Sequence, residues 1–194
     1  MLSANQKEEF ASLRVEIMDL NVLVYFFLKK INRYCHLWRT TTREYILEEL
    51  IALRYMENGI ILHLTNLDDD SDNSQYSFRA AAKSFNKVSK DPKLVHDLKE
   101  TLKTYRKNLN YLKVEYRNQR IAHLNYEKDL HFDEFLQFEK MLLPLIMEVN
   151  EIADQLWGEK VNVRFRLGSL EGVLDFRKDE ANYKSDRNEI QGFY

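Results

Sequence analysis

The chain has 194 residues, 44% of them hydrophobic and 31% charged, so it can bury a core and remain soluble as one domain. Its formal net charge of −2 excludes an overall field that would draw it to nucleic acid or to a membrane. Five glycines and two prolines are too few for the turns of a sheet protein, so the composition predicts long helices.

Nothing in the chain predicts secretion or membrane insertion. The single cysteine, Cys35, excludes an intramolecular disulfide and fits a reducing compartment. Lys7, Glu8 and Glu9 lie where a signal peptide would need an apolar core. The most apolar early run, residues 22–28, is far shorter than the about 20 residues that span a bilayer. We therefore expect a cytoplasmic protein without a membrane partner.

Apolar spacing predicts a first helix over about residues 4–35. One buried stripe consists of Leu13, Ile17, Leu20, Val24, Phe27 and Ile31. A second apolar row lies beside it and consists of Val15, Met18, Val22 and Tyr25. A helix that is apolar over so wide an arc packs against two neighbours or contributes to a dimer.

A second helix is predicted over about residues 42–66. Thr41 and Glu44 have the spacing of a capping box at its start. Gly59 is unfavourable inside a helix, which predicts close packing against a neighbouring helix there. His36 and His63 lie near apolar positions, and we expect both to be satisfied histidines of the core or its rim.

The next segment, residues 68–74, is rich in aspartate. A calcium-binding EF-hand loop would need Gly at its sixth position and Glu at its twelfth, where this chain has Asn73 and Arg79. We therefore expect a solvated loop. A short helix is predicted over about residues 75–89, with Tyr76, Ala80, Ala81 and Phe85 facing inward and Arg79, Lys83 and Lys87 facing outward.

The fourth predicted helix, about residues 92–122, carries two parallel stripes. It begins with Asp91 as N-cap and Pro92 at the first helical position. Its buried stripe is Leu98, Leu102, Tyr105, Leu109, Leu112 and Tyr116. Its polar stripe is Lys99, Lys103, Arg106, Asn110, Lys113, Arg117 and Arg120. Such a stripe is either a solvated face or a surface that follows the phosphates of a nucleic acid.

The remaining chain completes the predicted fold. Residues 124–131 are predicted as a loop, and residues 132–157 as a fifth helix that Pro144 should kink and Gly158 should end. Alternation over residues 161–167 predicts a short strand or an extended arm, and the polar residues 177–188 are expected to be loosely ordered. We predict an all-α, up-and-down bundle of about five helices over residues 1–158, with a C-terminal extension over residues 159–194.

The end of the fourth helix carries the most specific pattern in the chain. Residues 115–123 contain the pair Arg117-Asn118 and, directly before the loop, the pair Ala122-His123. This arrangement resembles the R-(x4–6)-H motif of HEPN-domain ribonucleases, and most closely the abortive-infection and toxin-type members of prokaryotes. The resemblance implies metal-independent RNA cleavage, without a cofactor, at a homodimer interface where two copies of the motif face each other. It also implies a defence or toxin–antitoxin setting, with an antitoxin protein as a further partner.

Each motif residue has a role that its chemistry supports. His123 titrates near neutral pH, so it fits a general acid or base that exchanges protons with a ribose 2′-OH or the leaving 5′-oxygen. Arg117 fits a phosphate clamp, because guanidinium binds two phosphate oxygens at once. Asn118 can orient the phosphate or the imidazole without titrating. Further RNA contacts are expected at Arg120, Lys113 and Arg106.

The motif residues also fit other interpretations. His123 continues the apolar stripe, so it can instead be a buried, hydrogen-bonded core residue. Arg117 and His123 lie about 120° apart on an ideal helix and need a frayed end, a kink or a partner subunit to converge. Asn125 stands where toxins paired with a nucleotidyltransferase antitoxin carry the modified tyrosine, with Tyr126 one residue later. The competing function is a non-catalytic nucleotide- or partner-binding module that dimerises through the same bundle.

Overall fold

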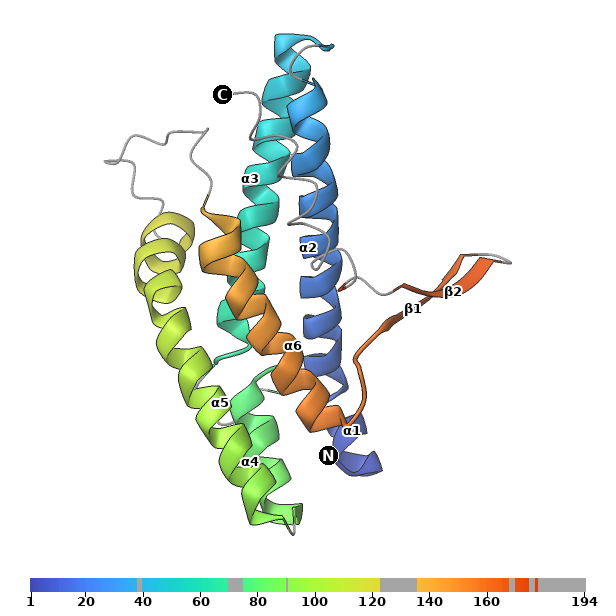
Figure 1. The fold of residues 1–194 in the computed structure, drawn as a ribbon, viewed down its shortest axis with the longest axis vertical. Helices are drawn as coiled ribbons and strands as arrows, with labels where there is room; N and C mark the ends of the chain where they lie inside the picture. The colour runs from blue at the N-terminus through green and yellow to red at the C-terminus, as the bar shows by residue number, and fades with distance from the viewer. Residues whose placement is uncertain are drawn as a thin grey trace.

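Figure 1 shows a computed structural model that describes residues 1–37, 40–69, 75–89, 91–122, 136–167, 170–174 and 177. Of residues 35, 119–122, 163–167 and 170–174 it describes the backbone alone. The described residues form eight helical segments and two strands: α1 (Ala4–Glu9), α2 (Ala11–Leu37), α3 (Arg43–Asn66), α4 (Phe78–Val88), α5 (Pro92–Tyr111), η1 (Leu112–Ala122), η2 (Phe138–Leu142), α6 (Leu143–Trp157), β1 (Val163–Leu167) and β2 (Leu170–Leu174).

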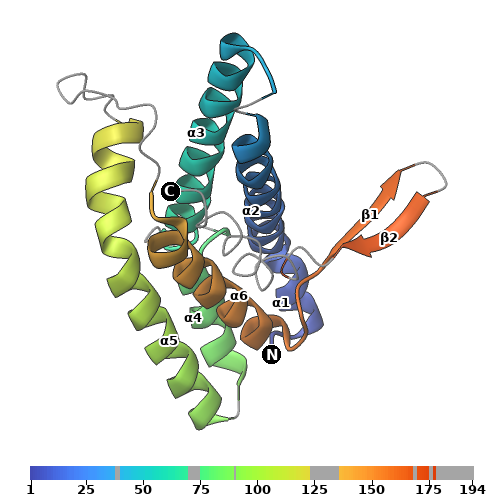
Figure 2. The ribbon, with the colours of Figure 1, turned by 45° about the horizontal axis from the view of Figure 1, so that its top comes forward.

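The helices form the predicted up-and-down bundle. α2 and α3 lie side by side as an antiparallel pair, α4 continues downward from the end of α3, and α5 with η1 runs back up (Figure 1). α6 returns along the bundle and packs against α2, α3, α4 and α5. Figure 2 shows the β1–β2 hairpin projecting away from these helices. The predicted all-α bundle is therefore confirmed, with a small hairpin added after it.

One continuous core lies between the helices. The predicted stripe of α2 is buried from Leu13 to Phe27, at 0–1% exposure, and Ile31 is half-buried. Facing side chains come from the other helices and include Leu53, Ile60, Leu64, Tyr105, Leu109, Ile146, Val149, Ile152 and Trp157. Inside this core the amides of Asn21 and Asn150 exchange two hydrogen bonds, at 2.9 and 3.0 Å, which fix α2 against α6.

Two helix starts follow the predicted capping chemistry, one of them a residue later than predicted. The hydroxyl of Thr42, not Thr41, accepts from the Tyr45 N–H at 3.3 Å, so the predicted capping box is wrong by one position. The carboxylate of Asp91 accepts from the N–H groups of Lys93 and Leu94, with Pro92 in the first turn as predicted.

Several predicted boundaries are wrong. The first helix is broken at Phe10, whose side chain turns into the core at 3% exposure. α4 starts only at Phe78, after its N-cap Ser77, so Tyr76 precedes the helix and is 52% exposed instead of buried. The last long helix is described from Phe138 rather than about 132, while the predicted loop 124–131 lies outside the described residues.

Two glycines and one proline have clear structural reasons. A Cβ on Gly59 would lie 2.7 Å from Leu23 Cδ2, which confirms close packing of α3 against α2. Gly158 ends α6 in the left-handed conformation, with φ of 69°, as predicted. Pro144 lies in the first turn of α6, directly after η2, where the helix changes from π to α geometry.

The chain on either side of the bundle is tied to the end of α6. The Leu2 N–H donates to the Leu156 carbonyl at 2.7 Å, and Leu2 itself is buried. Beyond the antiparallel β1–β2 hairpin, Arg177 pairs with Asp154 at 2.7 Å and donates to the Val161 carbonyl. Of the two alternatives predicted for residues 161–167, a short strand or an extended arm, the structure has a strand over Val163–Leu167. The polar residues 178–188 lie outside the described residues.

Candidate functional site

The predicted fourth helix changes type halfway along. Its range, residues 92–122, is right, but α5 ends at Tyr111 and η1 continues as a π-helix from Leu112 to Ala122. A π-helix bonds each N–H five residues back instead of four, an uncommon geometry that occurs frequently at functional sites. The motif up to Ala122 therefore lies on a wider helix than the apolar spacing predicts.

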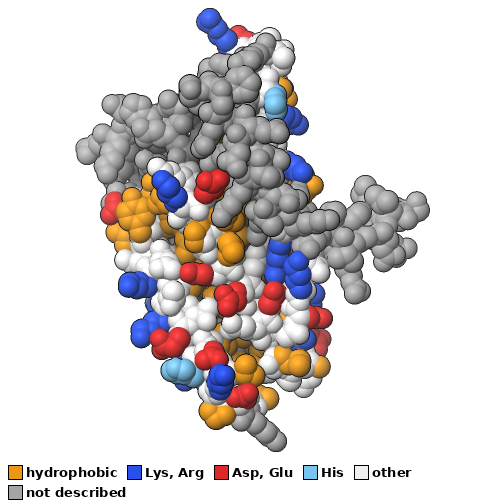
Figure 3. All heavy atoms as spheres, in the orientation of Figure 1, with side chains coloured by type: hydrophobic (Ala, Val, Ile, Leu, Met, Phe, Trp, Pro, Cys, Tyr) orange, Lys and Arg blue, Asp and Glu red, His pale blue; other side chains and the backbone are white. Residues whose placement is uncertain are grey.

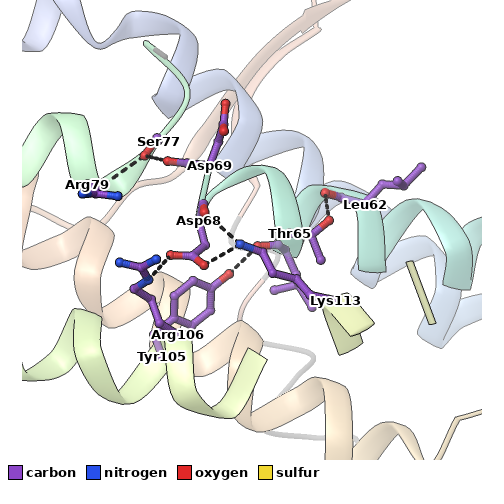
Figure 4. A network of polar contacts seen from close by, with 10 residues as sticks. Leu62, Thr65, Asp68, Asp69, Ser77, Arg79, Tyr105, Arg106 and Lys113 are labelled. Carbon is purple, nitrogen blue, oxygen red and sulfur yellow. Dashed lines mark hydrogen bonds and ion pairs between the residues drawn. The ribbon is translucent and has the colours of Figure 1, made fainter. Parts of the chain in front are cut away.

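A buried aspartate fastens this helix to the end of α3. Asp68 is 6% exposed, and its carboxylate meets Lys113 Nζ at 2.6 Å and Arg106 Nε at 3.0 Å. Lys113 Nζ also donates to the Asp68 carbonyl oxygen at 2.9 Å, and Figure 4 shows both cations converging on this residue. The prediction of a solvated loop is thus wrong for Asp68, because two cations compensate its burial.

A buried tyrosine adds a second tie at the same place. The hydroxyl of Tyr105 donates to the Leu64 carbonyl at 2.6 Å, which satisfies an acceptor in the last turn of α3. Burial raises the pKa of Tyr105 well above its ordinary value, and the negative charges of Asp68 and Glu148 raise it further. Tyr105 therefore stays neutral and acts as a hydrogen-bond donor that holds α5 to α3.

Next to Asp68 lies a polar cavity of about 490 Å³. It is bounded by the end of α3, by α2, by the segment before α4 and by η1, through Glu16, Thr65, Asn66, Asp68, Asp69, Tyr76, Lys113 and Arg117. Its volume falls within the range of small-ligand pockets. Arg117 brings an exposed guanidinium to it, and the exposed ring of Tyr76 offers a surface on which a base can stack.

The far wall of the cavity carries a second acid. Glu16 Oε1 accepts from His63 Nδ1 at 2.9 Å and from the Asn66 amide at 3.2 Å. The hydrogen bond from His63 lowers the pKa of Glu16 against the opposing effect of burial, and the charge of His63 and the Asn66 bond lower it further. His63 is thus a satisfied rim histidine, as predicted. His36 is exposed, so the prediction of a core or rim histidine is wrong for this residue.

The structure separates the predicted site residues into three groups. Lys113 and Arg106, predicted as RNA contacts, are both bound to Asp68. Arg117 and Asn118 lie exposed on η1, with Arg117 at the cavity. His123 lies outside the described residues, and Arg120 is described by its backbone alone, so the convergence of Arg117 and His123 stays a prediction.

The described chain resumes at Leu136, whose backbone is hydrogen-bonded to α3. The Leu136 N–H donates to Glu57 Oε1 at 2.6 Å, and Glu57, which is 1% exposed, is paired with Arg54 at 3.1 Å. A buried carboxylate that accepts a backbone N–H holds that segment firmly. The segment that contains His123 is therefore bounded by η1 on one side and by this α3 anchor on the other.

Sequence reasoning missed most of the cavity wall. Glu16, Thr65 and Asn66 lie on helix faces between core positions, and their meeting depends on how α2 and α3 cross. Asp68 carried one usable signal, since it directly follows Leu67, which is fully buried at the end of α3. An acid one residue beyond a buried helix end needs a cation nearby, and the basic stripe supplies two.

Among the described residues, no group of three or more His, Cys, Asp or Glu side chains is arranged to hold a metal ion. Within the same residues, none of the helices is both long and apolar enough to cross a membrane. The chain matches no protein-family model, no curated protein and no solved structure. Its functional interpretation therefore depends on the motif and on the geometry around it.

Proposed function

We propose that the chain is a metal-independent endoribonuclease of the HEPN type that acts as a homodimer in a defence or toxin–antitoxin setting. The observation that carries the proposal is the position of Arg117, exposed at a polar cavity, on a π-helix that ends directly before His123. A cation at a cavity that also offers an aromatic ring and hydrogen-bonding groups suits a nucleotide of an RNA chain.

The proposed reaction is attack of a ribose 2′-oxygen on the adjacent phosphorus. His123 takes the 2′-OH proton or gives one to the 5′-oxygen, the P–O5′ bond breaks, and the products carry a 2′,3′-cyclic phosphate and a 5′-OH. Arg117 binds the non-bridging oxygens and stabilises the charge that develops on them. Asn118, exposed beside Arg117, orients the phosphate or the imidazole.

A dimer interface at the motif would bury apolar surface that the monomer leaves exposed. Tyr111 is 52% exposed and Val114 44%, and both lie within seven residues of Asn118. Figure 3 shows hydrophobic side chains gathered over this upper end of α5. Two copies that pack through this patch would bring two motifs together, as the reaction requires.

A non-catalytic nucleotide- or partner-binding module is the second candidate. One observation favours it. Lys113 and Arg106 form ion pairs with Asp68, so fewer cations are available to an RNA backbone than the basic stripe suggests. Such a module would use the same cavity without cleaving its ligand.

The deciding experiment incubates purified protein with RNA in EDTA and analyses the product ends. A ribonuclease of this kind leaves 2′,3′-cyclic phosphate ends, loses them in Arg117→Ala and His123→Ala, and keeps them in the matched controls Arg43→Ala and His96→Ala, whose side chains are exposed elsewhere. Absence of cleavage for every RNA tested supports the binding module.

The dimer is tested separately by sedimentation. Val114→Glu should produce monomers and abolish cleavage, because a buried carboxylate disrupts an apolar interface. Ile51→Glu is the matched control, since Ile51 is 39% exposed on α3, away from the motif. If Ile51→Glu is monomeric and Val114→Glu remains dimeric, the dimer interface lies on α3 instead of at the motif.

A further inference from the structure

A second cavity, of about 430 Å³, lies between α4 and α5, and several lysine and arginine side chains border its largely apolar lining. Arg79, Lys83 and Asn86 border it from α4, and Lys99, Lys103 and Arg106 border it from α5. We call these six residues the α4/α5 groove. The sequence alone does not bring these residues together, because they lie on two helices whose packing creates the groove.

The charge of the groove is strongly positive. Asp68 is the acid among the described lining residues, and its carboxylate is already bound by Arg106 and Lys113. Lys103 also meets Glu100 at 3.6 Å, but both side chains are more than half exposed, so this pair screens the field only weakly. Cations from two helices that face one cavity suit a ligand with several negative charges.

The groove also offers hydrogen bonding and apolar contact. Ala82 and Leu102 form an apolar part of the lining. The Oδ1 atom of Asn86 is buried and has no hydrogen-bond partner among the described residues. A buried acceptor without a donor is unfavourable, and a ribose 2′-OH would supply that donor once the amide turns toward the cavity.

The groove adjoins the candidate active site. Asp68 lines both cavities, the first together with Lys113 and Arg117 and the second together with Arg106. Figure 4 shows Asp68 between Lys113 and Arg106. Lys99 and Arg106 are seven residues apart, or about 10 Å along an α-helix at about 1.5 Å per residue. A stretch of that length can contact more than one phosphate of a nucleic-acid chain.

We propose that the α4/α5 groove binds the backbone of single-stranded RNA and leads it past Asp68 to Arg117. The proposal rests on the proposed function for what happens at Arg117, but binding in the groove needs no cleavage. It makes Arg79, Lys83, Lys99 and Lys103, which line the groove, contacts of the RNA backbone.

The test measures binding of fluorescently labelled single-stranded RNA to the full chain carrying His123→Ala, or Arg117→Ala if the former does not fold. In this background Lys83→Glu with Lys99→Glu should weaken binding by about tenfold or more and lower the slope of log Kd against log salt by about 1.4. The matched control is Lys87→Glu with Lys93→Glu, which changes net charge equally at exposed positions of the same helices outside the groove.

Equal weakening by the two pairs would overturn the proposal, because the effect would then be one of overall charge. Binding of inorganic tripolyphosphate in the groove without any binding of RNA would also overturn the proposal. If wild-type protein cleaves RNA but the groove pair behaves as the control does, the groove proposal fails and the ribonuclease stands. If no RNA is cleaved but the groove pair alone loses RNA binding, the ribonuclease fails and the groove stands.

Discussion

The part of the basic stripe from Arg106 to Arg117 has a different role at each of its two ends. Arg106 and Lys113 converge on the buried carboxylate of Asp68, whereas Arg117 and Asn118, one turn further along, lie exposed at a cavity. In sequence Arg106, Lys113 and Arg117 belong to one polar stripe, and Asn118 directly follows Arg117. A basic stripe can therefore combine cations that hold the fold with cations that are available to a ligand, and the position of a buried acid distinguishes the two kinds.

The largest expected effect is at the available end. His123→Ala should lower RNA cleavage by about 10²–10⁴-fold, the usual contribution of a general acid or base, with the free energy of unfolding unchanged. Single-turnover cleavage and chemical denaturation measure the two quantities. The exposed His96→Ala serves as control. A large loss of stability in His123→Ala would instead identify a buried core histidine and remove the distinction between the two ends.

The next effect is at the structural end. Asp68→Asn should lower the free energy of unfolding by about 2–3 kcal/mol, somewhat less than for a fully buried pair because Arg106 and Lys113 stay partly exposed. Urea denaturation measures the change. Asp97→Asn, at an exposed position of α5, should change it by less than about 0.5 kcal/mol. Equal effects of the two substitutions would contradict the role given to Asp68.

The smallest effect concerns the acid on the opposite cavity wall. Because the folded state lowers the pKa of Glu16 below its ordinary 4.5, its stabilisation is present above that pH and is lost as pH falls through the folded pKa. Glu16→Gln should cost about 0.5–1 kcal/mol at pH 7, since the pair with His63 is partly exposed. Thermal denaturation from pH 7 to pH 3 should show the difference from wild type shrinking toward the acid end. A constant difference would mean that Glu16 contributes by packing alone.

Periodicity predicted the helices well because the core positions repeat at helical spacing. Leu13 to Phe27 and Leu98 to Leu112 are buried along the stripes that the spacing predicted, apart from the half-buried Leu102. The prediction that Tyr76 is buried was wrong, because Ser77 caps α4 and the helix starts two residues after Tyr76. The π-helical geometry of η1 could not be predicted from the sequence. Its hydrogen bonds join residues five apart, and no residue type in this segment is specific for that pattern.

The candidate site was predictable only in part. The motif pointed to Arg117 and Asn118, which the structure places exposed on η1, but the partners around them come from segments far away in the sequence. Glu16, Asn66 and Asp68 meet Arg117 at one cavity through the crossing of α2, α3 and η1. The sequence predicts Lys113 and Arg106 as RNA contacts because Asp68, the acid that both of them bind, lies far from them in the chain.

The most direct test measures stability and RNA cleavage side by side in Lys113→Ala and Arg117→Ala. We predict that Lys113→Ala lowers the free energy of unfolding by about 1–3 kcal/mol, yet each folded molecule cleaves RNA within an order of magnitude of wild type. Arg117→Ala should unfold as wild type does and lose about 10²–10³-fold in cleavage rate. The opposite pattern, a stable but inactive Lys113→Ala and an unstable but active Arg117→Ala, would contradict the division of the basic stripe into a structural end and a catalytic end.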